Sequence, residues 1–227
     1  MRTPDPLAHA AVSEARPGMV IGLGTGRAAA RGIEALAARA RQESTEFVCV
    51  ATSVRSADQA RALGLNVTEM ERVPRVDLLF DGADEVDPQL RMIKGRGGAM
   101  TREKIVARAA SRRIYLVQRS KMVPRLGASA PVPIEFLRFG AAWLEQALGK
   151  LGLFGSIRRE HGVEVRTDDG NPIFDAALPS GMDPAGLAAR LDTLPGVVGH
   201  GLFIDEADLV LVEEEDGRVT RLARPRG

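Results

Sequence analysis

The sequence predicts an α/β protein: a doubly wound, mostly parallel, Rossmann-like sheet with a smaller α+β domain, of ferredoxin-like type, inserted near the C-terminus. Three observations predict it. Short apolar runs alternate with helical segments through the first half of the chain. Two of these runs, 19–23 and 76–80, end in Gly-rich or acidic segments, where open parallel sheets bind ligands. The composition then shifts near residue 127, and two helical segments follow among several short strands.

The first half supplies the expected parallel sheet. Prolines and Pro17-Gly18 bound a helix over 4–16, and Gly64 ends a later helix in the manner of a C′ residue. Apolar runs of four to eight residues read as buried strands. The expected strands are 19–23, 47–51, 76–80 and 114–117, with 67–70 as a further candidate. The expected helices are 4–16, a segment with apolar spacing over 29–40, 53–63, and one that carries Glu103.

The second half supplies the smaller domain. Residues 130–133, with two prolines, read as a linker, and apolar residues recur at helical spacing over 139–151, where Trp143 is expected in the core. Strands are expected over 156–159, 163–167 and 172–176, with a hairpin turn at 169–171 and a helix over 183–194. Strands 209–213 and 219–222 return to the first domain. The predicted domains are therefore 1–127 plus 205–227, and 128–204.

Composition narrows the class of function. The 31 basic and 30 acidic residues give a net charge of +1, so no strong field favours nucleic acid or an anionic membrane. No apolar run approaches membrane-spanning length and no signal peptide is recognisable, so the chain is expected to be cytoplasmic. Cys49 is the only cysteine, and the three histidines are far apart in sequence, so a metal site is not expected.

The first expected strand runs into a Gly-rich turn, Gly22-Leu23-Gly24-Thr25-Gly26, and then into a helix. Free N–H groups at a helix start, together with the helix dipole, favour a bound anion. The turn is neither a full dinucleotide fingerprint nor a Walker A loop, so a small phosphomonoester fits better than a nucleotide. A tight turn without a ligand is an equally good interpretation of this motif by itself.

The central segment, 76–104, combines groups that suit catalysis. A buried strand ends in Asp81-Gly82-Ala83-Asp84-Glu85. A basic glycine loop, Lys94-Gly95-Arg96-Gly97-Gly98, follows, and then a helix with Glu103 near its start. Each residue taken singly suits an ordinary turn or surface position. Together they supply acids, a cation, exposed N–H groups and a candidate base.

Several of these motifs resemble ribose-5-phosphate isomerase of type A. They are GLGTG (22–26), DGADEVD (81–87), IKGRGGA (93–99), REKIV (102–106), SK (120–121), PVPIE (131–135) and GVVGHGLF (196–203). They occur in the order of the family and extend over most of the chain. The resemblance implies an aldose–ketose isomerase that interconverts ribose 5-phosphate and ribulose 5-phosphate without metal, nucleotide or other cofactor, and an oligomer, most simply a homodimer.

The resemblance also implies roles for individual residues. Glu103 would be the base that moves a proton between C1 and C2 of the sugar. Asp81 and Asp84, with Gly82 and Ala83 between them, would bind sugar hydroxyls and assist ring opening. The reacting oxygens would face Lys94, Gly95, Arg96 and Gly97. The rest of the substrate site would be Thr25, Gly26, Arg27, Ala28 and Lys121.

The chain departs from the family pattern at the substrate end. Arg27 and Ala28 replace the Ser and Thr of the phosphate turn, Arg96 replaces a glycine, and the usual N-terminal lysine is missing. Arg27 could grip phosphate in a bidentate manner or point to solvent. Three functions stay open: this isomerase with a rebuilt phosphate site, an isomerase of a related sugar or sugar phosphate, and a non-catalytic sugar-phosphate sensor. Retention of Glu103 argues against the sensor.

Overall fold

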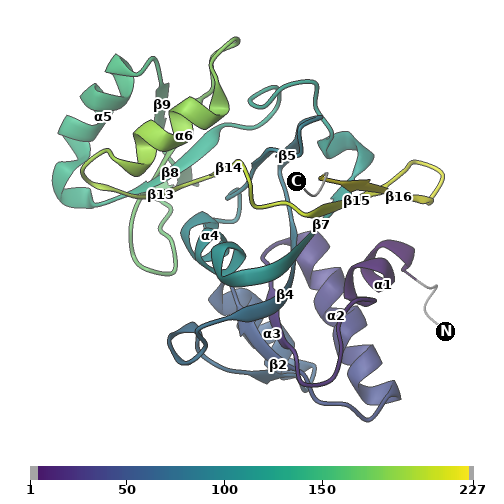
Figure 1. Cartoon of the computed structure of the whole chain (residues 1–227). Coiled ribbons are helices and arrows are strands. Elements are labelled where there is room, and N and C mark those ends of the chain that lie inside the picture. The colour runs from purple at the N-terminus through teal and green to yellow at the C-terminus, as the bar shows by residue number, and fades with distance from the viewer. Residues whose placement is uncertain (1–4, 225–227) are drawn as a thin grey trace. The chain divides into compact units, whose positions relative to one another are not determined.

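The structure is a computed structural model that describes residues 5–224 (Figure 1). The chain forms two compact units. The first unit consists of the described parts of 1–83, 102–122 and 206–227, and the second of 84–101 and 123–205.

The first unit is built on a seven-stranded sheet. Its strand order is β16 (Val219–Ala223), β15 (Leu209–Glu213), β7 (Ala110–Gln118), β4 (Val76–Gly82), β1 (Val20–Leu23), β2 (Val48–Ala51) and β3 (Asn66–Val67). Every pair is parallel except β15 with β16. The predicted α/β class with a mostly parallel sheet is confirmed.

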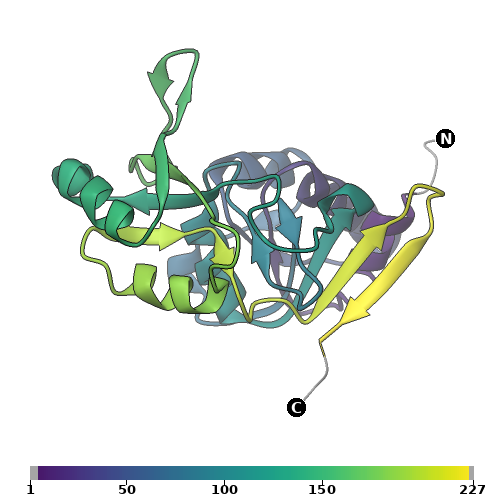
Figure 2. The ribbon, with the colours of Figure 1, turned by 90° about the horizontal axis from the view of Figure 1, so that it is seen from above.

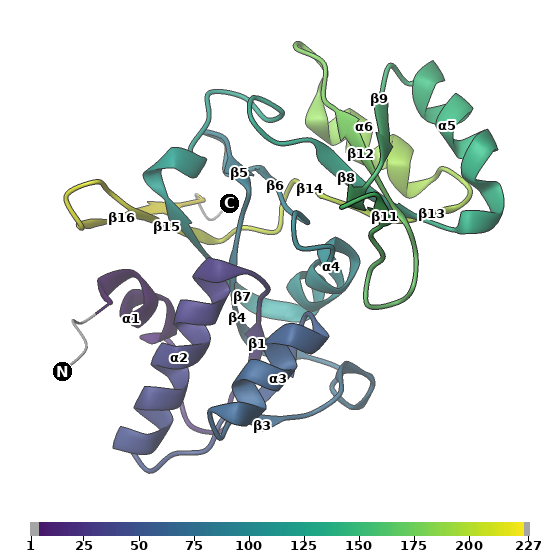
Figure 3. The same ribbon diagram turned by 180° about the vertical axis from the view of Figure 1, so that it is seen from behind.

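Helices cover both faces of this sheet, as strand alternation requires. The helices of the first unit are α1 (Pro6–Val12), α2 (Arg27–Gln42), α3 (Val54–Ala62) and most of α4 (Met100–Ala109), with short 3₁₀ turns η1 (Met70–Arg72) and η2 (Arg119–Lys121). Phe80 faces α2, where it lies against Gly32, while its neighbour Leu79 faces the side of α4, whose Val106 packs on Gly22. Figure 3 shows α2 and α3 side by side on one face.

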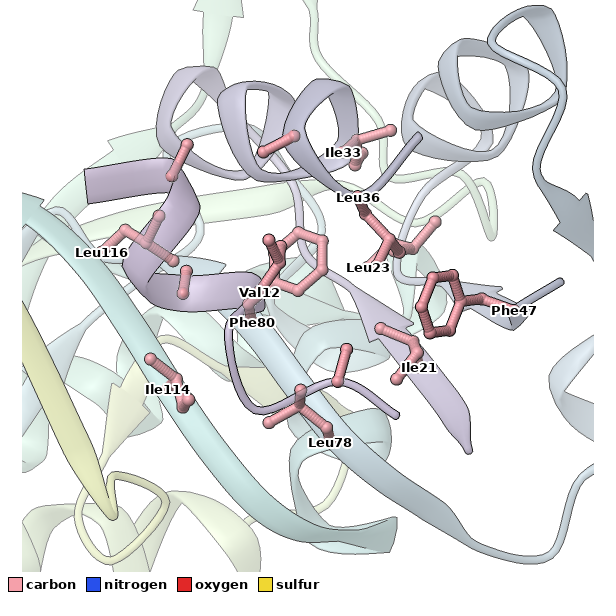
Figure 4. Close-up of a cluster of buried hydrophobic side chains, with 14 of the residues drawn as sticks. Val12, Ile21, Leu23, Ile33, Leu36, Phe47, Leu78, Phe80, Ile114 and Leu116 are labelled. Carbon is pink, nitrogen blue, oxygen red and sulfur yellow. The ribbon is translucent and has the colours of Figure 1, made fainter. Parts of the chain in front are cut away.

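The main core of the first unit lies between α1, α2 and the sheet (Figure 4). Ile21, Leu23, Phe80 and Ile114 of the strands meet Ile33 and Leu36 of α2 there. An ion-pair network adds to this packing. Asp5 caps α1 and bonds Arg31 of α2, with Nε to Oδ2 at 2.6 Å, and Arg31 also bonds Glu213 at 2.7 Å. The hydrogen bonds from Arg31 lower the pKa of both carboxyl groups.

The second unit has ferredoxin-like connectivity, as predicted. Its elements alternate as β8 (Val132–Phe136), α5 (Ala141–Lys150), β9 (Phe154–Ile157), β12 (Ile173–Ala177), α6 (Pro184–Asp192) and β13 (Val197–His200), with η3 (Arg138–Gly140) before α5. The strands form an antiparallel sheet in the order β13-β8-β12-β9. A separate hairpin, β10 (Arg159–Glu160) with β11 (Val163–Glu164), extends away from this sheet in green in Figure 2.

A third small sheet explains where the units divide. It pairs β14 (Leu202–Phe203) with β6 (Met92–Ile93), and β6 with β5 (Glu85–Val86). These two-residue strands are too short for a periodic pattern. The predicted boundaries assigned 84–101 and 123–127 to the first domain, whereas the structure groups both segments with the second unit. The backbone pairing of β6 with β14 is the physical reason for 84–101.

Three sequence predictions differ from the structure: the linker at 130–133, the burial of Trp143 and the bounds of the strand near residue 67. Residues 130–133, predicted as a linker, lead into β8, whose residues are all buried despite Pro133. Val132, Ile134 and Phe136 alternate into the core, and this packing outweighs the proline. Trp143, expected in the core, is 51% exposed, because Leu144 and Leu148 form the buried face of α5. The strand considered over 67–70 is Asn66–Val67, followed by η1.

Several elements are shorter than predicted. The first helix, predicted over 4–16, is Pro6–Val12, and residue 4 lies outside the described range. Within 5–224, no helix combines the length and apolar character needed to cross a bilayer. Over the same range, no group of three or more His, Cys, Asp or Glu side chains is placed to hold a metal ion.

Candidate active site

In the first unit, the predicted site residues lie at the carboxyl edge of the parallel sheet. The turn with Thr25 follows β1, Asp81 and Gly82 end β4, and Lys121 lies in η2 directly after β7. Because β1, β4 and β7 are adjacent and parallel, their ends share one edge. This is the edge at which open α/β sheets bind ligands.

Asp81 organises the turn after β1. Its side chain is fully buried, and its Oδ1 accepts hydrogen bonds from the N–H groups of Thr25 (3.0 Å) and Gly82 (2.7 Å). A Cβ at Gly24 would lie 2.1 Å from the same Oδ1. Gly24 is therefore required here by close approach, and the glycine turn and the acidic strand end form one unit of structure.

The turn itself opens α2. Gly26 is the N-cap residue, with φ of +101°, and Arg27 is the exposed first residue of the helix. Because Gly26 has no side chain, it makes no cap hydrogen bond, and the N–H groups of this helix start can bind an anion. Ala28 lies against Gly82, where an added Cβ would approach the Ala28 Cβ to 3.3 Å.

A hydroxyl cluster beside this turn was not predicted. Thr25 Oγ1 lies 2.7 Å from Thr52 Oγ1 and donates to Ser53 Oγ at 2.8 Å. Ser56 Oγ donates to the carbonyl of Gly24 at 2.7 Å. Ser53 is also the N-cap of α3. The available signal was the Thr-Ser pair that directly follows the strand 47–51, at the same edge of the sheet.

Glu103 lies in the first turn of α4 and is 3% exposed. α4 packs on the face that carries Leu79, and Tyr115 lies on that face because it pairs with Asp81 in register. Burial, followed by the charges of Asp81, Glu206 and Glu103, raises the pKa of Tyr115 well above its usual value. Glu103, Asp81 and Tyr115 are therefore three buried ionisable groups of the first unit, and the two carboxyl groups act electrostatically on the tyrosine.

The remaining predicted site residues, among them Asp84 and Lys94, belong to the second unit. Asp84 N–H donates to the carbonyl of Ile93 at 2.8 Å, and Asp84 Oδ2 accepts from the N–H of Arg96 at 2.9 Å. Lys94 is 2% exposed and its N–H donates to the carbonyl of Gly201 at 2.9 Å. Its Nζ lies 5.5 Å from the centre of the Phe203 ring, a cation–π contact that the sequence did not reveal.

The glycines of the basic loop have different tasks. Gly95 has φ of +104° and a Cβ there would lie 2.8 Å from Met100 Cβ, so glycine is required. Gly98 N–H donates to the carbonyl of Gly95 at 3.0 Å and is thereby used within the loop. Arg96 and Gly97 are exposed. The N–H of Gly97 therefore belongs to an exposed residue, whereas that of Gly98 is bonded within the loop.

Two neighbouring acids are structural. Glu85 accepts hydrogen bonds from the N–H groups of Gly127 (2.6 Å), Ser129 and Ala130 (2.8 Å). Asp87 accepts from Arg91, with Nε to Oδ2 at 2.7 Å. These carboxylates organise loops of the second unit.

The chemistry that these groups suit is proton transfer at a carbon next to a carbonyl. Such a C–H is a weak acid, so a base needs preorganised cations and N–H donors for the enediolate that forms. Each unit, taken by itself, contains residue types of this kind: Glu103, Asp81 and Lys121 in the first unit, and Asp84 and Lys94 in the second.

Comparison with known proteins agrees with this chemistry. The family model described as ribose 5-phosphate isomerase A (phosphoriboisomerase A) matches residues 48–217. Ribose-5-phosphate isomerase A of Thermomicrobium roseum is 43% identical over 218 residues, 95% of this chain and 92% of that protein.

Solved structures agree as well. Ribose 5-phosphate isomerase from Plasmodium falciparum superposes with a TM-score of 0.92 at 34% identity, over 98% of this chain and 100% of that one. A D-ribose-5-phosphate isomerase in complex with phospho-erythronic acid gives 0.91 at 36% identity, over 96% of each chain. The chain therefore belongs to the ribose 5-phosphate isomerase A family.

Proposed function

We propose that Glu103 is the base with which this isomerase interconverts ribose 5-phosphate and ribulose 5-phosphate. The observation that carries the proposal is a carboxylate that is 3% exposed in the first turn of α4. A single buried carboxylate can take a proton from one carbon and return it to the adjacent one, provided that water is kept away.

We propose that the basic loop stabilises the negative charge that develops during the reaction. The Lys94 ammonium, together with Gly95, Arg96 and Gly97, would stabilise the negative oxygen of the enediolate. Each preorganised donor of this kind contributes roughly 3–4 kcal/mol in other enzymes. The buried position of Lys94 supports this role, because charge interactions are stronger away from water.

Sugar binding is proposed for the two aspartates. Asp81 and Asp84, connected by Gly82 and Ala83, would accept hydrogen bonds from sugar hydroxyls and assist ring opening. Asp81 Oδ1 already bonds two backbone N–H groups, so its orientation is fixed before substrate arrives. This preorganisation supports the role.

Phosphate binding is proposed for the start of α2. Thr25, Gly26, Arg27 and Ala28 would surround the phosphate, with Lys121 as a further cation. The exposed Arg27 at the first helical position supports a bidentate contact that replaces the missing hydroxyls. In the variant Arg27→Ala, KM for the phosphosugar should rise with little change in kcat; an unchanged KM would remove Arg27 from this role.

The proposed working form is a cytoplasmic homodimer with a small sugar phosphate as its partner and no nucleic acid. The family resemblance supports the dimer, and the net charge of +1 supports the absence of a nucleic-acid partner. Light scattering coupled to size-exclusion chromatography tests the dimer directly: a monomeric mass would contradict it.

The central experiment measures isomerisation of ribose 5-phosphate by the wild type, Glu103→Gln and the control Glu145→Gln, which changes an exposed carboxyl of α5. We expect Glu103→Gln alone to lose turnover, by roughly 10²- to 10⁴-fold, since the base is removed while the shape is kept. Turnover that survives in Glu103→Gln would exclude Glu103 as the base. Thermal stabilisation by substrate without any wild-type turnover would favour a sensor.

A further inference from the structure

We propose that Arg158 is a positioning residue that holds the loop Lys94–Gly97 in its reactive conformation. The inference rests on the proposed function of that loop. Arg158 lies outside every motif that identified the family, between β9 and β10 of the second unit. It does not touch the reacting atoms in this proposal; it acts through the loop backbone.

Two hydrogen bonds connect Arg158 to the loop. Its Nη1 donates to the carbonyl oxygens of Gly95 at 3.0 Å and Arg96 at 2.9 Å. Two successive peptide groups of the basic loop are thus held by one guanidinium nitrogen.

The guanidinium is itself held in place. Its Nε and Nη2 donate to Asp175 of β12 at 2.7 and 2.6 Å, a bidentate pair with a fixed geometry. The Arg158 side chain is 11% exposed, and its backbone N–H donates to the carbonyl of Ile173 at 2.7 Å. A strand of the four-stranded sheet therefore fixes the position from which Arg158 reaches the loop.

The bonded carbonyls determine where the loop N–H groups point. In a trans peptide the C=O and N–H groups point in opposite directions, and the described residues contain no cis peptide bond. When the carbonyls of Gly95 and Arg96 turn toward Arg158, the N–H groups of Arg96 and Gly97 turn away from it. The Arg96 N–H then reaches Asp84 Oδ2 at 2.9 Å, and the Gly97 N–H is presented by an exposed residue.

This arrangement has a chemical consequence. Arg158 aligns one donor with Asp84, a proposed sugar ligand, and directs the other outward as a donor for a developing oxyanion. Such a donor accelerates reaction only if it is oriented beforehand. Loss of Arg158 would leave the Gly-rich loop free to turn either peptide, so the main effect should be on kcat.

The test compares Arg158→Met and Arg158→Lys with the matched control Arg159→Met. Arg159 is the next residue, and among the described residues its Nη1 donates to the carbonyl of Gly162 in the hairpin and not to the basic loop. We expect kcat to fall about 10- to 100-fold in Arg158→Met with KM within about threefold, because displacement of a reacting group by an ångström costs on the order of 100-fold. Arg158→Lys should recover only part of kcat, because an ammonium cannot make the bidentate pair and both carbonyl contacts.

Wild-type kcat in Arg158→Met, or an equal loss in Arg159→Met, would overturn the inference. If Arg158→Met does not fold, Asp175→Asn decides, because it keeps Arg158 and weakens only its anchor: reduced kcat in the folded protein supports the inference and wild-type kcat overturns it.

Hydrogen exchange separates this inference from the proposed function. Amides of residues 92–100 should exchange faster in Arg158→Met than in Arg159→Met, whatever the substrate; equal exchange would contradict the role of Arg158. Absence of wild-type turnover with ribose 5-phosphate would instead contradict the proposed function.

Discussion

Glu135 carries the sharpest stability prediction. This carboxylate of β8 is 1% exposed and accepts hydrogen bonds from Thr101 Oγ1, Thr167 Oγ1 (2.8 Å) and Asn171 Nδ2 (2.9 Å). It thereby joins the start of α4 to the turn before β12 within the second unit. We expect Glu135→Leu to destabilise that unit strongly and Glu135→Gln to do so mildly.

The magnitudes follow from the donors that each variant leaves behind. Leucine removes every acceptor. The buried Thr167 hydroxyl is then left without a partner for its donor, and Thr101 and Asn171 each lose a hydrogen bond to a charged group. The expected loss is about 3–5 kcal/mol. Glutamine keeps one acceptor oxygen, and a Thr hydroxyl can turn to accept from its NH₂ group, so the expected loss is about 1–2 kcal/mol.

Urea unfolding followed by tryptophan fluorescence suits this measurement. Trp143 is the only tryptophan and lies on α5, in the same unit as Glu135. The signal therefore reports the unfolding of the affected unit. The control Glu145→Gln, on the exposed side of α5, should change the free energy of unfolding by less than about 0.5 kcal/mol.

In some proteins a well-packed apolar side chain replaces a buried charge without loss of stability. The same outcome for Glu135→Leu would refute the reasoning. If Glu135→Leu unfolds within about 1 kcal/mol of the wild type, the three hydrogen bonds only balance the desolvation of the carboxylate. A Glu135→Gln variant as unstable as Glu135→Leu would show that charge, and not the number of acceptors, governs this cluster.

Three further predictions concern other buried groups. Gly24→Ala should reduce kcat/KM at least 10-fold, because the new Cβ would lie 2.1 Å from Oδ1 of Asp81; steady-state kinetics with near-wild-type activity would show that the turn relaxes at no cost. Phe203→Leu removes the cation–π contact with Lys94, and a desolvated contact of about 2 kcal/mol corresponds to a loss of roughly 30-fold in kcat/KM; no loss would mean that the ring only fills space. Burial raises the pKa of Cys49 to about 12, so its thiol should resist a disulfide reagent at pH 8 until urea unfolds the protein, and rapid labelling of the native protein would contradict this.

The predicted parts of the fold are those with strong local patterns. Alternation of apolar runs and helical segments identified the parallel sheet, and strand-end residues such as Asp81 and the turn at Thr25 were correctly assigned to one sheet edge. The helix that carries Glu103 was also predictable, because a Gly-rich loop precedes it. These features depend on neighbours in sequence, so the sequence reveals them directly.

Other predictions were wrong because the burial of a residue and the pairing of a strand depend on distant parts of the chain. Pro133 reads as a linker residue, yet the strand that holds it is buried on both sides. Trp143 reads as a core residue, yet α5 buries Leu144 and Leu148 in its place. A helix has several possible apolar faces, and only the sheet beneath it selects one.

The class of fold and the sheet edge that carries Asp81 follow from local patterns in the chain, and Glu103 follows from a motif. The side chains that support the basic loop are known only from contacts between distant residues. Arg158 is 63 positions from Gly95 in the chain, and Phe203 reaches Lys94 through the pairing of β14 with β6. Such contacts leave no periodic signature, because folding brings the partners together while their separation in sequence obeys no rule.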